Sequence, residues 1–254
     1  LHLVVGDYNN IATFQDLANH LKQYEVPVFY LAISPDYFAA VTEGLHQVGL
    51  TKNARVVVEK PFGRDLQSAI ALDAELKKIL REDQIFRIDH YLGKESVEDL
   101  LVFRFSNTLF EPVWNRNYIK SIQITMAENF GIEGRGRFYD DVGAIRDVFQ
   151  NHLLQVLTML TMEPPIDASA EAMSNEKVKL LDSIRAIEPS DVVRGQYVGY
   201  LDEEAVKPHS DTETFVALKL CIDNWRWAGV PIYVRTGKHL PETVLEAIVE
   251  FNKP

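Results

Sequence analysis

The sequence predicts an α/β unit followed by an α+β unit with a large, mostly antiparallel sheet. In the first third, short apolar runs alternate with amphipathic segments at helical spacing. Toward the other end, strand-like segments follow one another between residues 192 and 251. Alternating strands and helices are typical of a doubly wound parallel sheet, whereas consecutive strands are typical of antiparallel pairing. Because the pattern changes after Tyr91, we expect domains at 1–90 and 91–254.

The first third contains the elements of part of a parallel sheet. Residues 28–33 form a continuous apolar run closed by Ser34 and Pro35, as in a strand that is buried on both faces. Asp65 is placed to cap the next helix, because its carboxylate can accept a free N–H of the first turn. The expected elements are helix 14–24, strand 28–33, helix 37–48, strand 55–59, helix 66–81 and strand 85–88.

The rest of the chain begins with helical patterns and ends in strands. The apolar-striped segment 142–162 predicts one long helix that ends before Pro164 and Pro165. The expected elements are helix 96–105, strand 119–128, a glycine-rich loop at 131–136, helix 142–162, helix 174–186 and strands 192–200, 214–222, 231–236 and 244–251.

The composition is that of a globular protein with an acidic surface. The 254 residues include 26 basic and 37 acidic side chains, which gives a formal net charge of −11. This charge disfavours nucleic acid and anionic membranes as partners. No apolar run reaches about 18 residues, the length that a membrane span needs. The single cysteine, Cys221, excludes an intrachain disulfide and a multi-cysteine metal site, which favours a cytoplasmic protein.

Two segments carry most of the chemistry that the sequence offers. Residues 87–95 read Arg-Ile-Asp-His-Tyr-Leu-Gly-Lys-Glu, and residues 146–152 read Arg-Asp-Val-Phe-Gln-Asn-His. Basic and hydroxyl donors suit an anionic substrate, and a histidine that a carboxylate orients can abstract a proton. In this order, the two segments closely resemble the signature and the catalytic-histidine segment of the glucose-6-phosphate dehydrogenase family.

The resemblance extends over nearly the whole chain and implies both a fold and a reaction. It implies the C-terminal part of a Rossmann-like NAD(P)-binding domain in 1–90 and the family's α+β substrate and dimerisation domain in 91–254. It implies oxidation of the C1 hydroxyl of glucose 6-phosphate to 6-phosphogluconolactone, with hydride transfer to NADP, in the pentose phosphate pathway. It also implies a homodimer or homotetramer. The residues themselves suggest no metal site.

The catalytic pair that the resemblance implies is His152 and Asp89. His152 corresponds to the base for the C1 hydroxyl, and Asp89 to the carboxylate that orients it. Taken alone, a histidine on an apolar helix is more often a hydrogen-bonded core residue, and an aspartate a surface or capping residue. The flanking match favours the catalytic role, and Asp89 follows a predicted strand, where ligand sites of α/β sheets cluster.

The resemblance also implies donors for the substrate phosphate. His90, Tyr91 and Lys94 correspond to phosphate-binding residues, and Lys238 to a further base near the phosphate. Taken alone, Lys94 would be read as a solvated lysine. The family usually has a second base a few positions after Lys238, whereas here only His239 is available. This departure predicts a weaker phosphate affinity or an altered selectivity.

Four further residues correspond to family contacts with the sugar and the cofactor. Lys60 and Pro61, in Glu-Lys-Pro-Phe-Gly, correspond to cofactor-binding residues, and Lys60 also to a substrate contact. Glu128 and Asp147 correspond to acceptors for the sugar hydroxyls, although Glu128 alone would pass for a surface charge. Because Glu-Lys-Pro also occurs in other sugar dehydrogenases, that motif alone leaves the sugar open; the signature at 87–95 favours glucose 6-phosphate.

A glycine-rich nucleotide turn does not occur in the sequence. A dinucleotide-binding domain normally opens with a strand, G-x-G-x-x-G and a helix whose N-terminus holds the pyrophosphate. Because Leu1-His2-Leu3 reads like the interior of a protein, we expect a fragment of a longer enzyme. The alternative is a non-catalytic sugar-phosphate-binding or dimer-forming module that has lost its nucleotide site. The pair of His152 and Asp89 favours an active parent.

Overall fold

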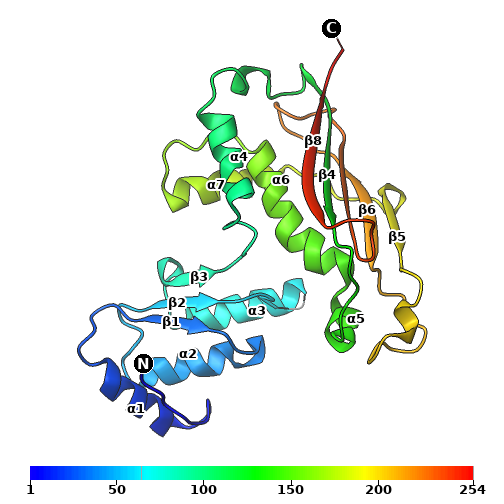
Figure 1. Ribbon diagram of the computed structural model, residues 1–254. Coiled ribbons are helices and arrows are strands. Elements are labelled where there is room, and N and C mark those ends of the chain that lie inside the picture. Colours follow the sequence, from blue (N-terminus) through cyan, green and yellow to red (C-terminus); the bar gives the residue numbers. More distant parts are fainter. Residues whose placement is uncertain (64, 254) are drawn as a thin grey trace. The chain divides into compact units, whose positions relative to one another are not determined.

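The computed structural model describes residues 1–63 and 65–253 (Figure 1). The chain divides into two compact units, Leu1–Asp89 and His90–Pro254. Each unit has its own sheet and its own apolar core. Within the described ranges, no helix is both long enough and apolar enough to cross a bilayer.

The first unit contains a parallel sheet in the strand order β1–β2–β3. Leu31, Val56 and Ile85, one from each strand, lie on the same face of this sheet and are buried against apolar side chains of the three helices. The elements are α1 (Ile11–Leu21), β1 (Val28–Leu31), α2 (Phe38–Gln47), β2 (Arg55–Val58), α3 (Leu66–Lys77) and β3 (Ile85–Arg87).

The predicted order of elements in this unit is confirmed. The prediction that the strand at 28–33 is buried on both faces is wrong, because β1 ends at Leu31 and its Val28 and Tyr30 are 60% and 55% exposed. Further differences lie at helix ends. Asp65 caps α3 as predicted, since its side chain accepts a hydrogen bond from the amide of Ser68 at 2.8 Å. Helix α1 begins at Ile11 rather than at residue 14, because Asn10 accepts a bond from the amide of Ala12 at 3.0 Å. Helix α3 ends at Lys77 rather than at residue 81.

The second unit contains a five-stranded mixed sheet in the order β5–β6–β7–β4–β8. The prediction of a mostly antiparallel sheet is confirmed, and the exception is β4, which pairs parallel with β7 and antiparallel with β8. The helices and strands of this unit are α4 (Glu95–Phe105), β4 (Ile119–Ala127), α5 (Gly136–Ala144), α6 (Leu154–Thr161), α7 (Ala170–Asp182), β5 (Val192–Gly195), β6 (Phe215–Leu220), β7 (Ile232–Gly237) and β8 (Val244–Phe251).

The prediction of one long helix over 142–162 is wrong, because the helical run is interrupted. Between α5 and α6 lies a π-helical segment, Ile145–Leu153. Gly143 has φ 69° and ψ 173°, and Asp147 has φ −125° and ψ 74°, so neither residue is helical. The apolar stripe continues through both breaks, and periodicity therefore does not reveal them.

The end of α6 is closed by side chains from three distant parts of the second unit. The last carbonyls of a helix have no partner within the helix, so each needs a donor from elsewhere. Here the donors are the guanidinium of Arg104 and two indole N–H groups, all on buried side chains. The bonds run from Arg104 to the carbonyls of Met159 and Met162 at 2.9 Å each, from Trp114 to Leu160 at 2.8 Å and from Trp227 to Thr161 at 2.6 Å.

Beyond the helix end, Glu163 binds Arg226 through two bonds, of 2.9 and 2.5 Å, which hold the pKa of this carboxyl below its usual value. A carboxyl whose pKa is lower in the folded chain stabilises the fold above its unfolded pKa and loses this contribution as the pH falls through the folded pKa. The protonated acid then resembles glutamine. We therefore expect Glu163→Gln to cost most unfolding free energy near neutral pH and progressively less as the pH falls below the unfolded pKa and through the lowered folded pKa.

Urea unfolding at several pH values checks this expectation. Tryptophan fluorescence follows the second unit alone, because Trp114, Trp225 and Trp227 all lie in it. A difference between wild type and Glu163→Gln that stays constant from pH 7 to pH 3 would contradict the pKa shift.

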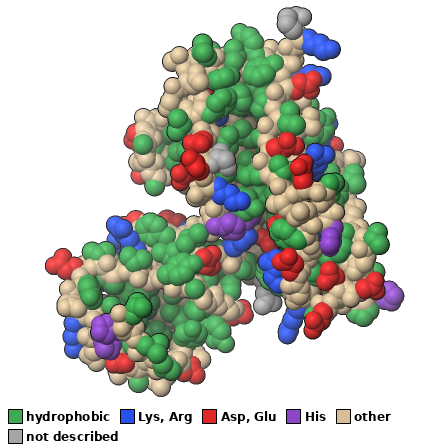
Figure 2. Space-filling model, in the orientation of Figure 1, with side chains coloured by type: hydrophobic (Ala, Val, Ile, Leu, Met, Phe, Trp, Pro, Cys, Tyr) green, Lys and Arg blue, Asp and Glu red, His purple; other side chains and the backbone are tan. Residues whose placement is uncertain are grey.

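Charged side chains of both signs are interspersed on the face shown in Figure 2. The net charge of −11 is thus carried without a continuous basic stripe on that face. A basic stripe is the usual footprint of a nucleic-acid-binding surface.

Candidate active site

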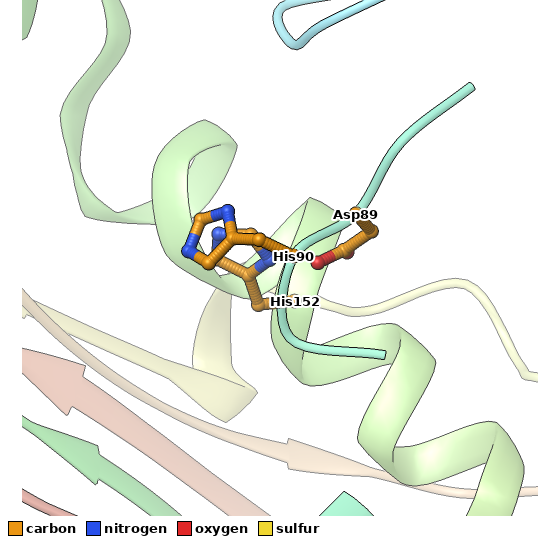
Figure 3. A group of neighbouring side chains, drawn as sticks. All are labelled: Asp89, His90 and His152. Atoms are coloured by element: carbon orange, nitrogen blue, oxygen red, sulfur yellow. The ribbon is translucent and has the colours of Figure 1, made fainter. Parts of the chain in front are cut away.

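The two predicted segments meet within the second unit around His152. This residue lies in the π-helical segment and is buried, with 1% of its surface exposed. Its ring centroid lies 4.1 Å from that of Tyr91 and 4.6 Å from that of His90. Figure 3 shows the rings of His90 and His152 side by side, one from the turn before α4 and one from the helical segment. A single buried imidazole is thus held against two phosphate-binding candidates.

The turn at 90–94 gathers the predicted phosphate donors. The Lys94 ammonium lies 3.6 Å from the centroid of the Tyr91 ring, a cation–π contact. The rings of His90 and Tyr91 lie 4.9 Å apart. His90 and Lys94 are exposed and Tyr91 is half-buried, so that an anion from solvent can reach these groups. The structure therefore brings these three residues together beside His152.

Asp147 is joined to His152 through one intervening side chain. The side-chain nitrogen Nδ2 of Asn151 donates to Asp147 Oδ1 at 2.9 Å, and Asn151 Oδ1 accepts from the backbone N–H of His152 at 2.6 Å. Asn151 thereby binds the backbone at one end and a carboxylate at the other, and it spans the irregular turn between them. The π-helical geometry is what places Asp147 and His152 on one local network.

Lys238 and Glu128 form an ion pair at the ends of two neighbouring strands. The parallel register pairs Ala127 of β4 with Gly237 of β7, so the next residues of both strands emerge together. The Lys238 ammonium lies 2.5 Å from Glu128 Oε2 and is only 8% exposed. The sequence predicted one residue as a phosphate base and the other as a sugar acceptor, and it did not predict that they pair.

Tyr139 of α5 is a residue at this site that sequence reasoning missed. The Lys238 ammonium lies 5.2 Å from its ring centroid. Burial raises the pKa of the Tyr139 hydroxyl, and the negative charges of Glu213, Asp147 and Glu128 raise it further. The Tyr139 hydroxyl is therefore a neutral donor, and the charges of both predicted sugar acceptors act on it. Its position in a pattern of mixed polarity, 136–144, gave no signal for this role.

His239, the residue available where the family usually has a second base, packs against an aromatic ring, and its role at the phosphate stays a prediction. Its ring packs edge-on against that of Tyr197, with centroids 4.4 Å apart. A Cβ on Gly131 would lie only 2.7 Å from His239 Nε2, so the imidazole is also seated against this glycine loop. His239 is nevertheless exposed to solvent.

The remaining predicted residues belong to the first unit. Lys60 and Pro61 follow the carboxyl end of β2, the central strand of the parallel sheet, and are half-buried. Their peptide bond is cis. Asp89 is half-buried and is the last residue of the first unit, directly before His90 in the chain. Asp89, His90 and His152, drawn in Figure 3, are three neighbouring residues of types that can bind metal ions; the sequence expectation of no metal site stays a prediction.

Comparisons with known proteins agree with these segments. The family model of the glucose-6-phosphate dehydrogenase NAD binding domain matches residues 1–99, and that of the C-terminal domain matches residues 101–254. Glucose-6-phosphate 1-dehydrogenase 1 of Mycobacterium tuberculosis is 50% identical over 95% of this chain and 52% of its own length. The chain spans about half the length of the curated relatives it matches.

Solved structures give the same result for the fold. A glucose-6-phosphate 1-dehydrogenase from Mycobacterium avium is 48% identical and superposes with a TM-score of 0.94 over 98% of this chain and 55% of its own. A glucose-6-phosphate dehydrogenase in complex with its substrate glucose-6-phosphate is 44% identical, with a TM-score of 0.93 and the same coverage. Sequence, fold and relatives therefore agree that this chain belongs to the glucose-6-phosphate dehydrogenase family.

Proposed function

We propose that the protein oxidises the C1 hydroxyl of glucose 6-phosphate to 6-phosphogluconolactone, with hydride transfer to NADP. The observation that carries the proposal is the buried ring of His152 against His90 and Tyr91, with Lys94 over the same tyrosine. A base beside hydrogen-bond donors that can bind an anion suits a phosphorylated substrate that must lose a proton. Relatives that carry the name of this activity support the proposal.

In this reaction, His152 takes the proton of the C1 hydroxyl as the hydride leaves C1. Asp89 accepts the N–H of the imidazole, which selects the tautomer and stabilises the imidazolium that forms. What supports this role is that Asp89 directly precedes His90 in the chain, and the ring centroid of His90 lies 4.6 Å from that of His152. Burial keeps water away from the imidazole, so that the substrate hydroxyl does not compete with water for this base.

The substrate would be held at both ends. His90, Tyr91 and Lys94 bind the phosphate dianion, since each presents a donor and the lysine also a positive charge. Lys238 is a further base for the phosphate, while Glu128 and Asp147 accept bonds from sugar hydroxyls. Because Lys238 and Glu128 already bind each other, substrate hydroxyls and phosphate must share or replace that ion pair.

NADP is the cofactor that we propose, and Lys60 and Pro61, which follow β2, are candidates for contacts with it. Ligands of open α/β sheets bind at the carboxyl ends of the strands, where Lys60 and Pro61 lie. Lys60 offers a cation to the phosphates or hydroxyls of a dinucleotide and to the sugar substrate. When bound, NADP supplies the acceptor for the hydride.

NADPH formation tests the reaction directly. The purified protein, with glucose 6-phosphate and NADP, is expected to produce the absorbance of the reduced nicotinamide, and free glucose much less of it. A folded protein that binds glucose 6-phosphate but forms no NADPH would favour the second candidate, a sugar-phosphate-binding or dimer-forming module without catalysis. The Lys238–Glu128 pair and the turn at 90–94 would serve either function.

The role of Lys94 leads to a separate prediction. Lys94→Ala is expected to weaken glucose 6-phosphate binding by about 1.5–3 kcal/mol, the range for a hydrogen bond to a charged group, and to leave glucose almost unaffected. Calorimetric titration with both sugars measures this difference. The matched control is Lys52→Ala, an exposed lysine of the first unit. Equal losses for the two sugars would argue against a phosphate contact.

We also propose a cytoplasmic homodimer or homotetramer. A single cysteine among 254 residues is compatible with a reducing compartment. Self-association through the second unit is supported by its exposed sheet surface, on which Tyr233 and Ile248 are 46% and 47% exposed. Analytical ultracentrifugation measures the mass of the assembly, and a monomer at all concentrations would contradict this proposal.

A further inference from the structure

The helical run that carries His152 starts afresh after a break in the backbone. Gly143 leaves the helical region with φ 69° and ψ 173°, and Ala144 and Ile145 begin the next helical turn. The first N–H groups of such a turn have no partner within the helix. They must be bonded from elsewhere if the segment from Ile145 to His152 is to hold its position.

Glu213, just before β6, supplies both of the first acceptors. Its backbone carbonyl accepts the N–H of Ala144 at 3.0 Å, and its carboxylate oxygen Oε1 accepts the N–H of Ile145 at 3.0 Å. Only 8% of Glu213 is exposed, although it is a carboxylate. A helix cap usually comes from the residue directly before the helix, whereas this one comes from a segment far along the chain. The contact therefore exists only in the folded second unit.

The break itself is shaped to admit this carboxylate. A Cβ on Gly143 would lie 2.7 Å from Glu213 Oε1 and 3.0 Å from its carboxyl carbon. The positive φ of Gly143 also disfavours any other residue. Glycine thus provides both the backbone conformation and the space that Glu213 needs.

The charge of Glu213 lies where a negative charge is favourable. Carboxylates stabilise the first turn of a helix, because the free N–H groups there carry partial positive charge. After burial, the charge of Glu213 is the largest cause that raises the pKa of Tyr139, whose ring centroid lies 5.2 Å from the Lys238 ammonium. At the far end of the run, the carbonyls that close α6 are bonded by Arg104. Both ends of the irregular run are thus held by buried side chains.

We propose that Glu213 is a positioning residue for the reaction: it caps the helical turn that begins at Ile145 and thereby sets the position of Asp147 and His152. The bonds that define this role run from the N–H groups of Ala144 and Ile145 to Glu213. The proposal rests on the proposed function for its catalytic consequence, whereas the capping role concerns the chain alone.

Hydrogen exchange tests the capping role without substrate or cofactor. In the chain 1–254, Glu213→Ala is expected to speed the exchange of the amides from Ile145 to His152 by about 3- to 30-fold, the range for a lost helix cap. Glu213→Gln keeps an oxygen acceptor and is expected to stay near wild type. The matched control is Asp211→Ala, an exposed carboxylate two positions away in the same unit. Exchange in Glu213→Ala equal to that of the control would overturn the proposal.

Kinetics in an active preparation test the consequence. With the turn released, kcat is expected to fall about 10- to 100-fold, because small misplacements of catalytic groups cost this much. KM for glucose 6-phosphate should rise by a smaller factor than kcat falls, since Asp147 lies on this turn, whereas the phosphate donors at 90–94 lie on a different segment. Glu213→Gln should recover most of kcat. A glutamine variant as impaired as the alanine variant would overturn the acceptor role. If wild type has no turnover but the exchange result holds, the proposed function fails and the capping role stands.

Discussion

Replacing His152 with asparagine is expected to lower turnover by about 10²–10⁴-fold, the usual contribution of a positioned general base. Asparagine is similar in size and polar, and it can fill the space of a side chain that is 1% exposed. It cannot take a proton near neutral pH. The dissociation constant of glucose 6-phosphate should therefore change little, because Tyr91 and Lys94 keep their places.

The measurement is the initial rate of NADPH formation, with substrate affinity determined separately by calorimetry. His209→Asn is the matched control: it makes the same chemical change at an exposed histidine of the same unit. His209 has φ 61°, a conformation that asparagine tolerates well. A His152→Asn variant with near-normal turnover would refute the base assignment, and one that no longer binds the sugar would show that the ring serves binding.

Arg104→Ala is expected to destabilise the second unit by about 3–5 kcal/mol, the cost of removing one partner from a buried ionic group. The guanidinium is fully buried, and burial lowers the pKa of Arg104 to about 10. Its Nη1 and Nη2 bind the carbonyls of Met159 and Met162, and Nη2 lies 3.5 Å from Glu111 Oε2. Alanine would leave these acceptors in the core without their donor, together with a cavity.

Urea unfolding followed by tryptophan fluorescence measures this cost. The control is Arg194→Ala on β5, an exposed arginine whose loss should change the unfolding free energy by less than about 0.5 kcal/mol. A loss of under about 1 kcal/mol for Arg104→Ala would mean that water replaces the guanidinium at the helix end. Helix α6 directly follows the segment that carries His152, so the turnover of the variant would show whether the closure of this helix end also affects catalysis.

Local patterns in the sequence were sufficient to predict the order of the elements. Apolar runs such as 56–58 and alternation such as that of 119–128 are typical of strands, so the strands follow from the periodicity. Burial was less predictable, since Val28 and Tyr30 in the apolar run 28–33 are 60% and 55% exposed. The cap at Asp65 was predictable because donor and acceptor lie three residues apart. The chemistry of the site was predictable for a related reason, since the signature at 87–95 places its donors next to one another along the chain.

Contacts between distant residues were not predictable in this way. The apolar stripe of 142–162 looks continuous, yet the backbone leaves the helical region at Gly143 and Asp147. At Gly143 this break makes room for the carboxylate of Glu213, which lies 70 residues later in the sequence. For the same reason, Arg104 reads as a surface residue of a helix until its carbonyl partners on α6 are known.

The order of the amino acids was enough to identify the strands and helices in order, the donors at 90–94, and His152 in an apolar helical stretch. How these residues combine became visible only in the folded chain, where His152 packs against Tyr91, Lys238 binds Glu128 and Glu213 caps the turn before Asp147. The physical reason is that periodicity and capping depend on neighbours within a few residues, whereas ion pairs and remote caps depend on strand register and helix packing.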